Sequence, residues 1–343
     1  MQKFLYASGA FVAVLIIIGF LLPRHSRVEV SALVDAPAAT VFALVNDFRR
    51  VDIWAPRTAA DPNARVIFSG PPRGVGATVT WDGVIAGSGT QTIVESRPHE
   101  HVATTINPGE AGEAHTWFDI GREDGATRVT WGFAHDHGLN LVGRYFALLL
   151  AGVVRREFET GITALEELAE SLPATDFGDL EVEHLVVDAL EIAYLPTTSP
   201  PEPAAISNAM GKAYFEILSF IDAHGLAENG PPMSVVRGFT GSELRFDAAI
   251  PVRGTTEATP RSGTAVRLGL TYAGPVIRVR HTGSYRQLGA THRKIAAYLA
   301  ALGLERNGDP WETYVSDPTR VAEAQLLTDV YYPVREDQKR EPR

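Results

Sequence analysis

The feature that most constrains the fold is an internal repeat in the C-terminal half of the chain. Residues 213–236 (AYFEILSFIDAHGLAENGPPMSVV) align with residues 291–315 (THRKIAAYLAALGLERNGDPWETYV), about 78 residues later. RFDAAIPV at 245–252 and LTDVYYPV at 327–334 follow in the same order. Each copy is typical of a helix, an Asn-Gly turn and two strands. The repeat predicts two copies that pack into one pseudo-symmetric domain with a groove between them.

The two copies differ at the strand that follows the Asn-Gly turn. The second copy has Trp311 and Glu312 there, whereas the first has Met233 and Ser234. Because side chains alternate along a strand, Glu312 and Tyr314 are expected on one face and Trp311 on the other. A carboxylate beside a phenol suits a cationic aromatic ligand, or general acid–base chemistry in an apolar groove. The alternative is a half-exposed strand whose glutamate faces water.

Composition and motifs exclude several classes of function. The net charge of −10 argues against a nucleic-acid-binding surface, and the lack of cysteine excludes disulfides and thiolate chemistry. His135 and His137 form one pair of alternate residues that could converge on a metal ion, and His99 and His101 form another. Neither pair has a third ligand at an informative spacing. We therefore predict no metal site and no cofactor.

An uncharged apolar run, residues 4–22, opens the chain. As a helix it would span about 28 Å, close to the hydrocarbon thickness of a bilayer. The run is long for a signal peptide and no small-x-small cleavage site follows it, and it is too uniformly apolar for a core helix. The prediction is a single-pass N-terminal membrane anchor within residues 1–25. Lys3 lies on one side and Arg24 and Arg27 on the other, so the side of the soluble domains stays open.

The sequence pattern of residues 26–172 predicts, in order, a strand, helices, a series of antiparallel strands and one long helix. The predicted strands are 27–34, 64–70, 76–84, 87–97, 101–107, 113–120 and 126–135; the predicted helices are 38–48 and 139–172, and RRVDIWAP (49–56) is expected to be a connector.

The opening series VEVSALVDAPAATVFALVNDFRRVDIWAP resembles the START-like superfamily (SRPBCC, polyketide cyclase-like). The resemblance implies a helix-grip fold, in which a curved sheet surrounds the long helix and leaves an elongated apolar cavity. Aromatic side chains are the candidates to line that cavity, with plain core packing as the alternative for each. These candidates are Trp81, Trp117, Trp131, Phe133 and Phe146.

A Pro- and Gly-containing linker at 173–181 precedes the repeat domain at 182–335, and a charged tail at 336–343 is expected to be disordered. H-T-G-S-Y, D-P-W-E-T-Y-V-S-D-P and T-D-V-Y-Y-P-V make this domain similar to the GyrI-like effector-binding domain of AraC-type and MerR-type regulators. The resemblance implies two strand–helix–strand–strand halves around a ligand cleft. It also implies that Glu312 meets cationic or polar ligand groups and that Tyr285 lies near the cleft; otherwise Tyr285 packs a turn.

These features predict an α+β, membrane-anchored binding protein for hydrophobic small molecules, cationic ones among them, that acts in sensing or sequestration without catalysis. The expected partners are a small hydrophobic ligand and the membrane, with no nucleic acid. One alternative is a hydrolase- or cyclase-type enzyme that uses Glu312 and Tyr314 as an acid–base pair, or the START-like cavity. The others are a transcription accessory protein without its own DNA-binding domain and an interaction protein with vestigial pockets. Ligand identity and oligomeric state stay open.

Overall fold

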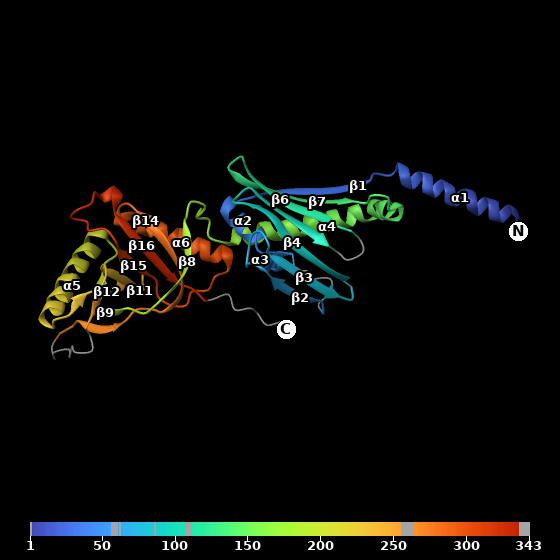
Figure 1. The fold of residues 1–343 in the computed structure, drawn as a ribbon. Helices are drawn as coiled ribbons and strands as arrows, with labels where there is room; N and C mark the ends of the chain where they lie inside the picture. Colours follow the sequence, from blue (N-terminus) through green and yellow to red (C-terminus); the bar gives the residue numbers. More distant parts are fainter. Residues whose placement is uncertain are drawn as a thin grey trace. The chain divides into compact units, whose positions relative to one another are not determined.

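Figure 1 shows the computed structural model of the protein, which describes residues 2–55, 61, 63–85, 87–107, 112–254 and 264–335. The chain divides into two compact units, built mainly from residues 1–178 and 179–339. Each unit contains one antiparallel sheet together with helices, so the protein is of the α+β class. The predicted tail at 336–343 lies outside the described residues.

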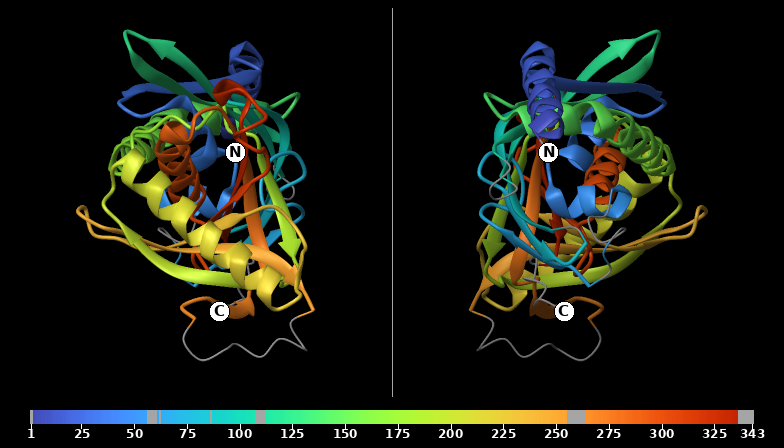
Figure 2. Two further views of the ribbon diagram at one scale, coloured as in Figure 1. Left: turned by 90° about the vertical axis from the view of Figure 1, so that its left-hand side faces the viewer. Right: turned by 90° about the vertical axis from the view of Figure 1, so that its right-hand side faces the viewer.

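The first unit is a seven-stranded sheet in the order β1-β7-β6-β5-β4-β3-β2, with a long helix that packs along β1 (Figures 1 and 2). The seven predicted strands and the long helix are confirmed. The strands are β1 (His25–Val34), β2 (Arg65–Ser69), β3 (Thr78–Gly83), β4 (Gly87–Arg97), β5 (His101–Asn107), β6 (Ala114–Glu123) and β7 (Ala126–Asp136); the helices are α1 (Gln2–Leu21), α2 (Ala38–Val45), α3 (Phe48–Trp54) and α4 (Leu141–Ser171).

Helix α3 corrects the expectation of a connector after α2. The Asp47 side chain accepts a hydrogen bond from the backbone N–H of Arg49 at 2.8 Å and caps the new helix. Phe48, Val51 and Trp54 then lie on one helical face and are buried in the core. The cap and this spacing start a second short helix where the sequence pattern indicated only a loop.

The predicted membrane anchor at residues 4–22 is wrong. In the described part of the chain, no helix combines the length and the apolar character needed to cross a membrane.

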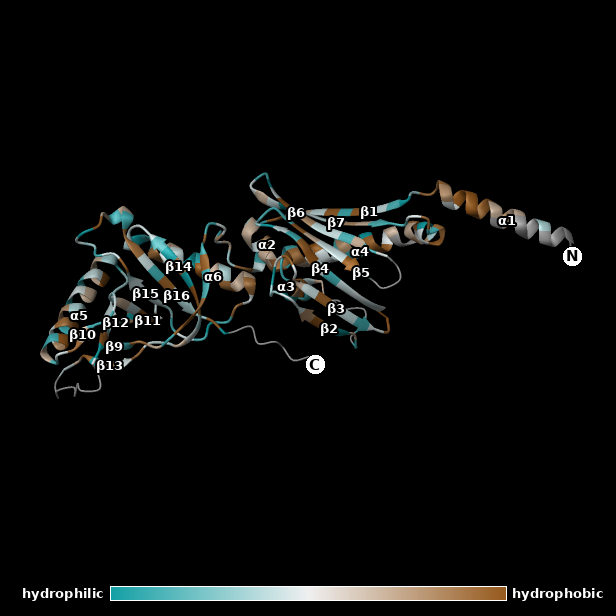
Figure 3. Ribbon diagram, in the orientation of Figure 1, coloured by the Kyte–Doolittle hydropathy of each residue, from teal (hydrophilic) through white to brown (hydrophobic). Residues whose placement is uncertain are grey.

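Helix α1 does form, and its C-terminal end packs against α4. Arg144 Nη1 donates to the backbone carbonyls of Gly19 (3.3 Å), Phe20 (3.3 Å) and Leu22 (3.2 Å), which are unpaired at a helix end. Tyr145 Oη donates to the carbonyl of Leu15 at 2.6 Å. Hydropathy colouring shows apolar residues at this end of α1 (Figure 3).

The second unit is one larger sheet in the order β13-β9-β12-β11-β15-β16-β14-β8, with β10 paired to β12. Helix α5 packs on β9 and β12, where Ile217, Phe220, Phe246 and Ile250 are buried together. The elements are β8 (Val182–Val187), β9 (Glu191–Ser199), α5 (Pro203–Ala223), β10 (Ala227–Glu228), β11 (Met233–Phe239), β12 (Leu244–Arg253), β13 (Arg267–Leu270), β14 (Gly274–Thr282), η4 (Tyr285–Gln287), α6 (Leu288–Leu302), β15 (Trp311–Tyr314), η5 (Glu323–Gln325) and β16 (Leu327–Pro333).

The two repeats take the same local conformation. The Asn-Gly turns place Gly230 at φ +156° and Gly308 at φ +157°, a backbone region that requires glycine. A Cβ on Gly230 would lie 3.3 Å from Pro251, and one on Gly308 would lie 3.3 Å from Pro333. The sheet order then joins the copies through the β11–β15 pair.

Candidate ligand site at Glu312

Glu312 lies in the middle of the repeat sheet, where the two copies meet. Strand β15 pairs with β11 so that Glu312 is opposite Ser234, and both residues are buried. The two side chains project to the face of the sheet that also receives contacts from α5 and α6. A buried carboxylate is costly unless its oxygens are hydrogen-bonded.

Both carboxylate oxygens of Glu312 have hydrogen-bond partners that carry no permanent charge. His292 Nε2, from α6, is 2.8 Å from Oε1, and Tyr314 Oη donates to Oε2 at 2.7 Å. The other imidazole nitrogen, His292 Nδ1, is 2.8 Å from the hydroxyl of Tyr332 on β16. The result is a continuous hydrogen-bonded chain from Tyr332 through His292 and Glu312 to Tyr314.

The tyrosine at the end of this chain fixes the direction of its hydrogen bonds when His292 is neutral. Burial raises the pKa of Tyr332 to about 12, against a smaller opposing effect of Arg306. Tyr332 is therefore protonated at neutral pH and can donate to Nδ1. Nε2 then carries the imidazole proton and donates to Glu312.

Further aromatic side chains surround the carboxylate. Burial, followed by the negative charge of Glu312, raises the pKa of both Tyr314 and Tyr214, the latter from α5. Burial also raises the pKa of Tyr285, whose ring meets that of Tyr314 edge-to-face at 5.4 Å. The sulfur of Met210, on α5, lies 3.7 Å from Tyr314 Oη. These groups give the site one anionic centre within a set of phenol rings.

Of the residues predicted for this site, Glu312, Tyr314 and Tyr285 are brought together and Trp311 is not. Trp311 projects to the opposite face of the sheet, as strand alternation requires. Its indole stacks on Tyr331 at 4.8 Å, and it is buried beside Met233 and Val276. Trp311 is thus part of the core on the face opposite to Glu312, and a role in ligand binding stays a prediction for it.

Sequence reasoning missed three contributors to the site: His292, Tyr214 and Tyr332. The repeat alignment contains a signal for two of them, because Tyr214 and His292 are equivalent positions on the two helices. Both lie on helices that cover the strand with Glu312. Tyr332 lies two residues after Val330, the β16 partner of Glu312, and so projects to the same face.

The aromatic residues proposed to line a cavity in the first unit fall on different surfaces. Trp131 projects toward α4 and stacks on Phe158 at 4.0 Å, so it is part of the core. Trp117 projects to the other face of the sheet, where the Arg27 guanidinium lies 4.9 Å from its ring. Phe146 is 56% exposed on α4.

Trp81 and Phe133 are the two remaining candidates on the sheet. The ring of Trp81 covers Gly89, where a Cβ would lie 2.4 Å from it. Phe133 is partly buried and pairs with Thr116, on the face that projects toward α4. A role in lining a cavity stays a prediction for these two residues.

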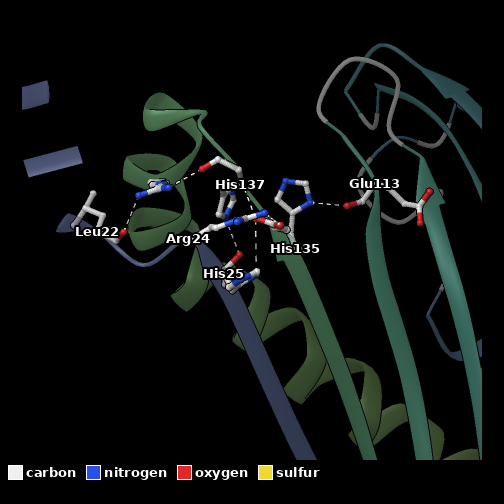
Figure 4. A network of polar contacts seen from close by, with 10 residues as sticks. Leu22, Arg24, His25, Glu113, His135 and His137 are labelled. Carbon is white, nitrogen blue, oxygen red and sulfur yellow. Dashed lines mark hydrogen bonds and ion pairs between the residues drawn. The ribbon is translucent and has the colours of Figure 1, made fainter. Parts of the chain in front are cut away.

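The histidine pair near the end of β7 belongs to a polar network (Figure 4). His135 Nδ1 lies 2.9 Å from the carbonyl of Glu113, and His137 Nε2 lies 2.9 Å from Ser26 Oγ. Burial is the main cause that lowers the pKa of His137, and the neighbouring His135 adds to it. Among the described residues, no group of three or more potential ligands could hold a metal ion.

Two family models match the chain in tandem. Residues 25–170 match the family described as polyketide cyclase / dehydrase and lipid transport. Residues 180–335 match the GyrI-like small molecule binding domain. The chain thus has tandem matches to a polyketide cyclase-like (SRPBCC) family model and a GyrI-like family model, in agreement with both family resemblances.

Solved structures show only distant similarity. The EcmrR–DNA complex and the isolated EcmrR C-terminal domain each align with 46% of this chain at 12% identity and a TM-score of 0.40. The alignment spans 58% of the first EcmrR chain and 99% of the second. Ara h 8.0201 aligns with 43% of this chain and 99% of its own at 14% identity and a TM-score of 0.32. None of the curated proteins compared with the chain matches it.

Proposed function

We propose that the protein binds small molecules and that the C-terminal unit holds a cationic aromatic ligand at Glu312. The observation that carries the proposal is a buried carboxylate whose two hydrogen-bond partners are an imidazole and a phenol. Neither partner supplies the permanent positive charge of an arginine or lysine. The family match to a small-molecule-binding domain supports the same reading.

A cation would gain from both the charge and the rings around it. An uncompensated carboxylate attracts a positive charge more strongly at low dielectric than in water. Aromatic faces add about 0.5–2 kcal/mol through cation–π attraction. Tyr285 lies in η4, just before α6, and is partly exposed, so its ring is the natural first contact for a ligand.

For the first unit we propose the helix-grip arrangement and an apolar ligand. The family description, which includes lipid transport, supports this proposal, as does the apolar sheet face that packs on α4. The ligand would have to lie beyond the Trp131–Phe158 stack, because that stack fills the core.

An acid–base role for Glu312 and Tyr314 stays a second prediction. The raised pKa of Tyr314 would keep its hydroxyl protonated, so it would be the member of the pair that holds the proton, and a weak acid.

The test is calorimetric titration of the full chain with 1-methylquinolinium and with 1-methylnaphthalene, an uncharged molecule of the same shape. Glu312→Gln should lower the affinity for the cation at least about tenfold and leave that for the neutral compound nearly unchanged. Glu305→Gln is the matched control, because this glutamate is in the same unit with its side chain 68% exposed. Equal cation affinities in the wild type and Glu312→Gln, or no saturable binding, would overturn the proposal.

A further inference from the structure

We infer that His292 makes ligand binding at Glu312 proton-linked, so that a bound cation and a protonated His292 compete for the same carboxylate. The inference rests on the proposed function of Glu312 and adds the regulation of that site. It follows from the position of the imidazole, its access to solvent and its partners in both charge states.

His292 is placed to neutralise Glu312. Its Nε2 is 2.8 Å from Glu312 Oε1, so a protonated imidazole would form an ion pair within the site. The side chain of His292 is 22% exposed, compared with 12% for Glu312, so protons from solvent reach the imidazole more readily than the carboxylate. A neutral His292 leaves one negative charge at the site, and a protonated His292 leaves none.

Tyr332 lets His292 change its charge without losing a hydrogen bond. When His292 is neutral, the Tyr332 hydroxyl donates to Nδ1. When His292 is protonated, both ring nitrogens are donors, and the same hydroxyl can rotate to accept from Nδ1. Neither state leaves a buried nitrogen unpaired, so the titration needs no rearrangement of the backbone.

The remaining charged or titratable groups around this pair do not replace Glu312 as the partner of His292. Tyr314, Tyr214 and Tyr285 face Glu312, and their raised pKa values keep them neutral in the imidazole range. The positive charge of Arg306 acts on Tyr332, whose pKa it lowers against the larger effect of burial. On α6 itself, Lys294 pairs with Asp179, and Arg293 is a neighbour of His292 in sequence.

The first repeat lacks both the histidine and the glutamate at the equivalent positions. Tyr214 takes the equivalent position on α5 and donates to the backbone carbonyl of Met233 at 3.0 Å. The position equivalent to Glu312 in this copy of the repeat is Ser234, which is not a carboxylate. The titratable imidazole and the carboxylate thus occur together in one copy and are absent together from the other.

The direction of the pH effect follows from these charges. When His292 is protonated, it neutralises Glu312 and a cation must displace it. When His292 is neutral, the site is anionic and open to the cation. Cation affinity should therefore rise with pH by up to about tenfold per unit across the imidazole range and then level off.

The experiment is calorimetric titration of the full chain with 1-methylquinolinium between about pH 5.5 and about pH 8.5. Each point is measured in two buffers that differ in ionisation enthalpy, which counts the protons released. The wild type should release up to one proton per cation at the acidic end and none at the alkaline end. The uncharged 1-methylnaphthalene should release none at any pH.

Two variants separate His292 from other histidines. His292→Gln, which keeps an amide donor for Glu312, should bind the cation with an affinity that is flat over this range and without proton release. His184→Gln, at an exposed position of β8, should behave like the wild type. Circular dichroism checks the folding of each variant, and the wild-type proton count tests the inference without any variant.

The possible failures are distinguishable. Saturable cation binding with a pH-independent affinity and no proton release in the wild type would overturn the inference and leave the proposed function standing. Equal proton release by the wild type and His292→Gln would also overturn it, because another group would then be titrating. No saturable cation binding at any pH would overturn the proposed function, and the inference with it.

Discussion

Ser234 and Glu312 are direct cross-strand partners, and they are also equivalent positions of the two repeats. The Cβ atoms of such partners lie about 5 Å apart. Two carboxylates at that distance on a buried face would repel each other strongly. The duplicated fold therefore favours a single acidic residue at this junction, which agrees with the sequence difference between the copies.

Ser234→Glu should for this reason destabilise the second unit. Burying a second carboxylate against the first is expected to lower the free energy of unfolding by about 3 kcal/mol or more. Urea unfolding of the full chain, followed by tryptophan fluorescence, measures the change. Ser234→Gln adds the same bulk without the charge and should lose much less. The exchange variant Ser234→Glu/Glu312→Ser should recover most of the difference, and equal losses for the Gln and Glu variants would contradict the argument.

Tyr332 should ionise late in an alkaline titration. Its pKa is raised to about 12, whereas an unfolded chain ionises tyrosine near pH 10. Between these values the unfolded state has lost the proton and the folded state keeps it. The stability contributed by Tyr332 is thus fully present below about pH 10 and is lost as pH rises toward about 12.

Absorbance of phenolate at 295 nm measures this ionisation in the full chain. Tyr332→Phe should remove one group from the late-titrating part of the curve. Tyr6→Phe, at an exposed position of α1, should remove one from the early part. A Tyr332→Phe curve that loses amplitude near pH 10 instead would show that the hydroxyl is not buried beside His292.

Much of the fold was predictable because the signals are local. Alternation located all seven strands of the first unit, and the Asn-Gly turns with Gly230 and Gly308 located the repeat. The network around Glu312 was predictable only in part, because His292 and Tyr332 reach it from other elements. No spacing along the chain reveals that the Tyr332 hydroxyl and the His292 imidazole meet.

The membrane anchor and helix α3 failed for different physical reasons. The sequence of residues 4–22 does not show which neighbour will contact them, and the end of α1 is held by Arg144, more than 100 residues away in sequence. Helix α3 is short, so its pattern is weak and its formation depends on the Asp47 cap. For Trp117 and Phe146, the aromatic residue type alone does not indicate which surface of the unit the side chain faces.

Trp131 and Trp117 provide a matched test of core against surface in the first unit. Trp131 is stacked on Phe158 and packed against Trp54, so Trp131→Leu should lower the free energy of unfolding by about 3 kcal/mol or more. Trp117 covers Gly132 on the opposite face, and Trp117→Leu should cost about 1 kcal/mol. Urea unfolding of the full chain, followed by circular dichroism, measures both. Similar losses would mean that the two faces are equally packed.

Arg144 should determine how firmly the end of α1 is held against α4. Its side chain is buried, and its guanidinium donates to carbonyls at the end of α1 and to that of Gly138 at 2.6 Å. Arg144→Met retains much of the apolar stem and leaves those carbonyls without their charged donor, a loss of about 1.5–3 kcal/mol per well-formed bond in favourable cases. Hydrogen–deuterium exchange should then be faster for the peptide that covers residues 15–22.

Two control variants accompany this measurement. Tyr145→Phe, which removes a single hydrogen bond to Leu15, should produce a smaller increase in exchange, and Arg156→Met, at an exposed position of α4, should produce none. Unchanged exchange in Arg144→Met would mean that apolar contacts of α1 with α4, such as Gly19 against Leu141, are sufficient to hold this end of the helix.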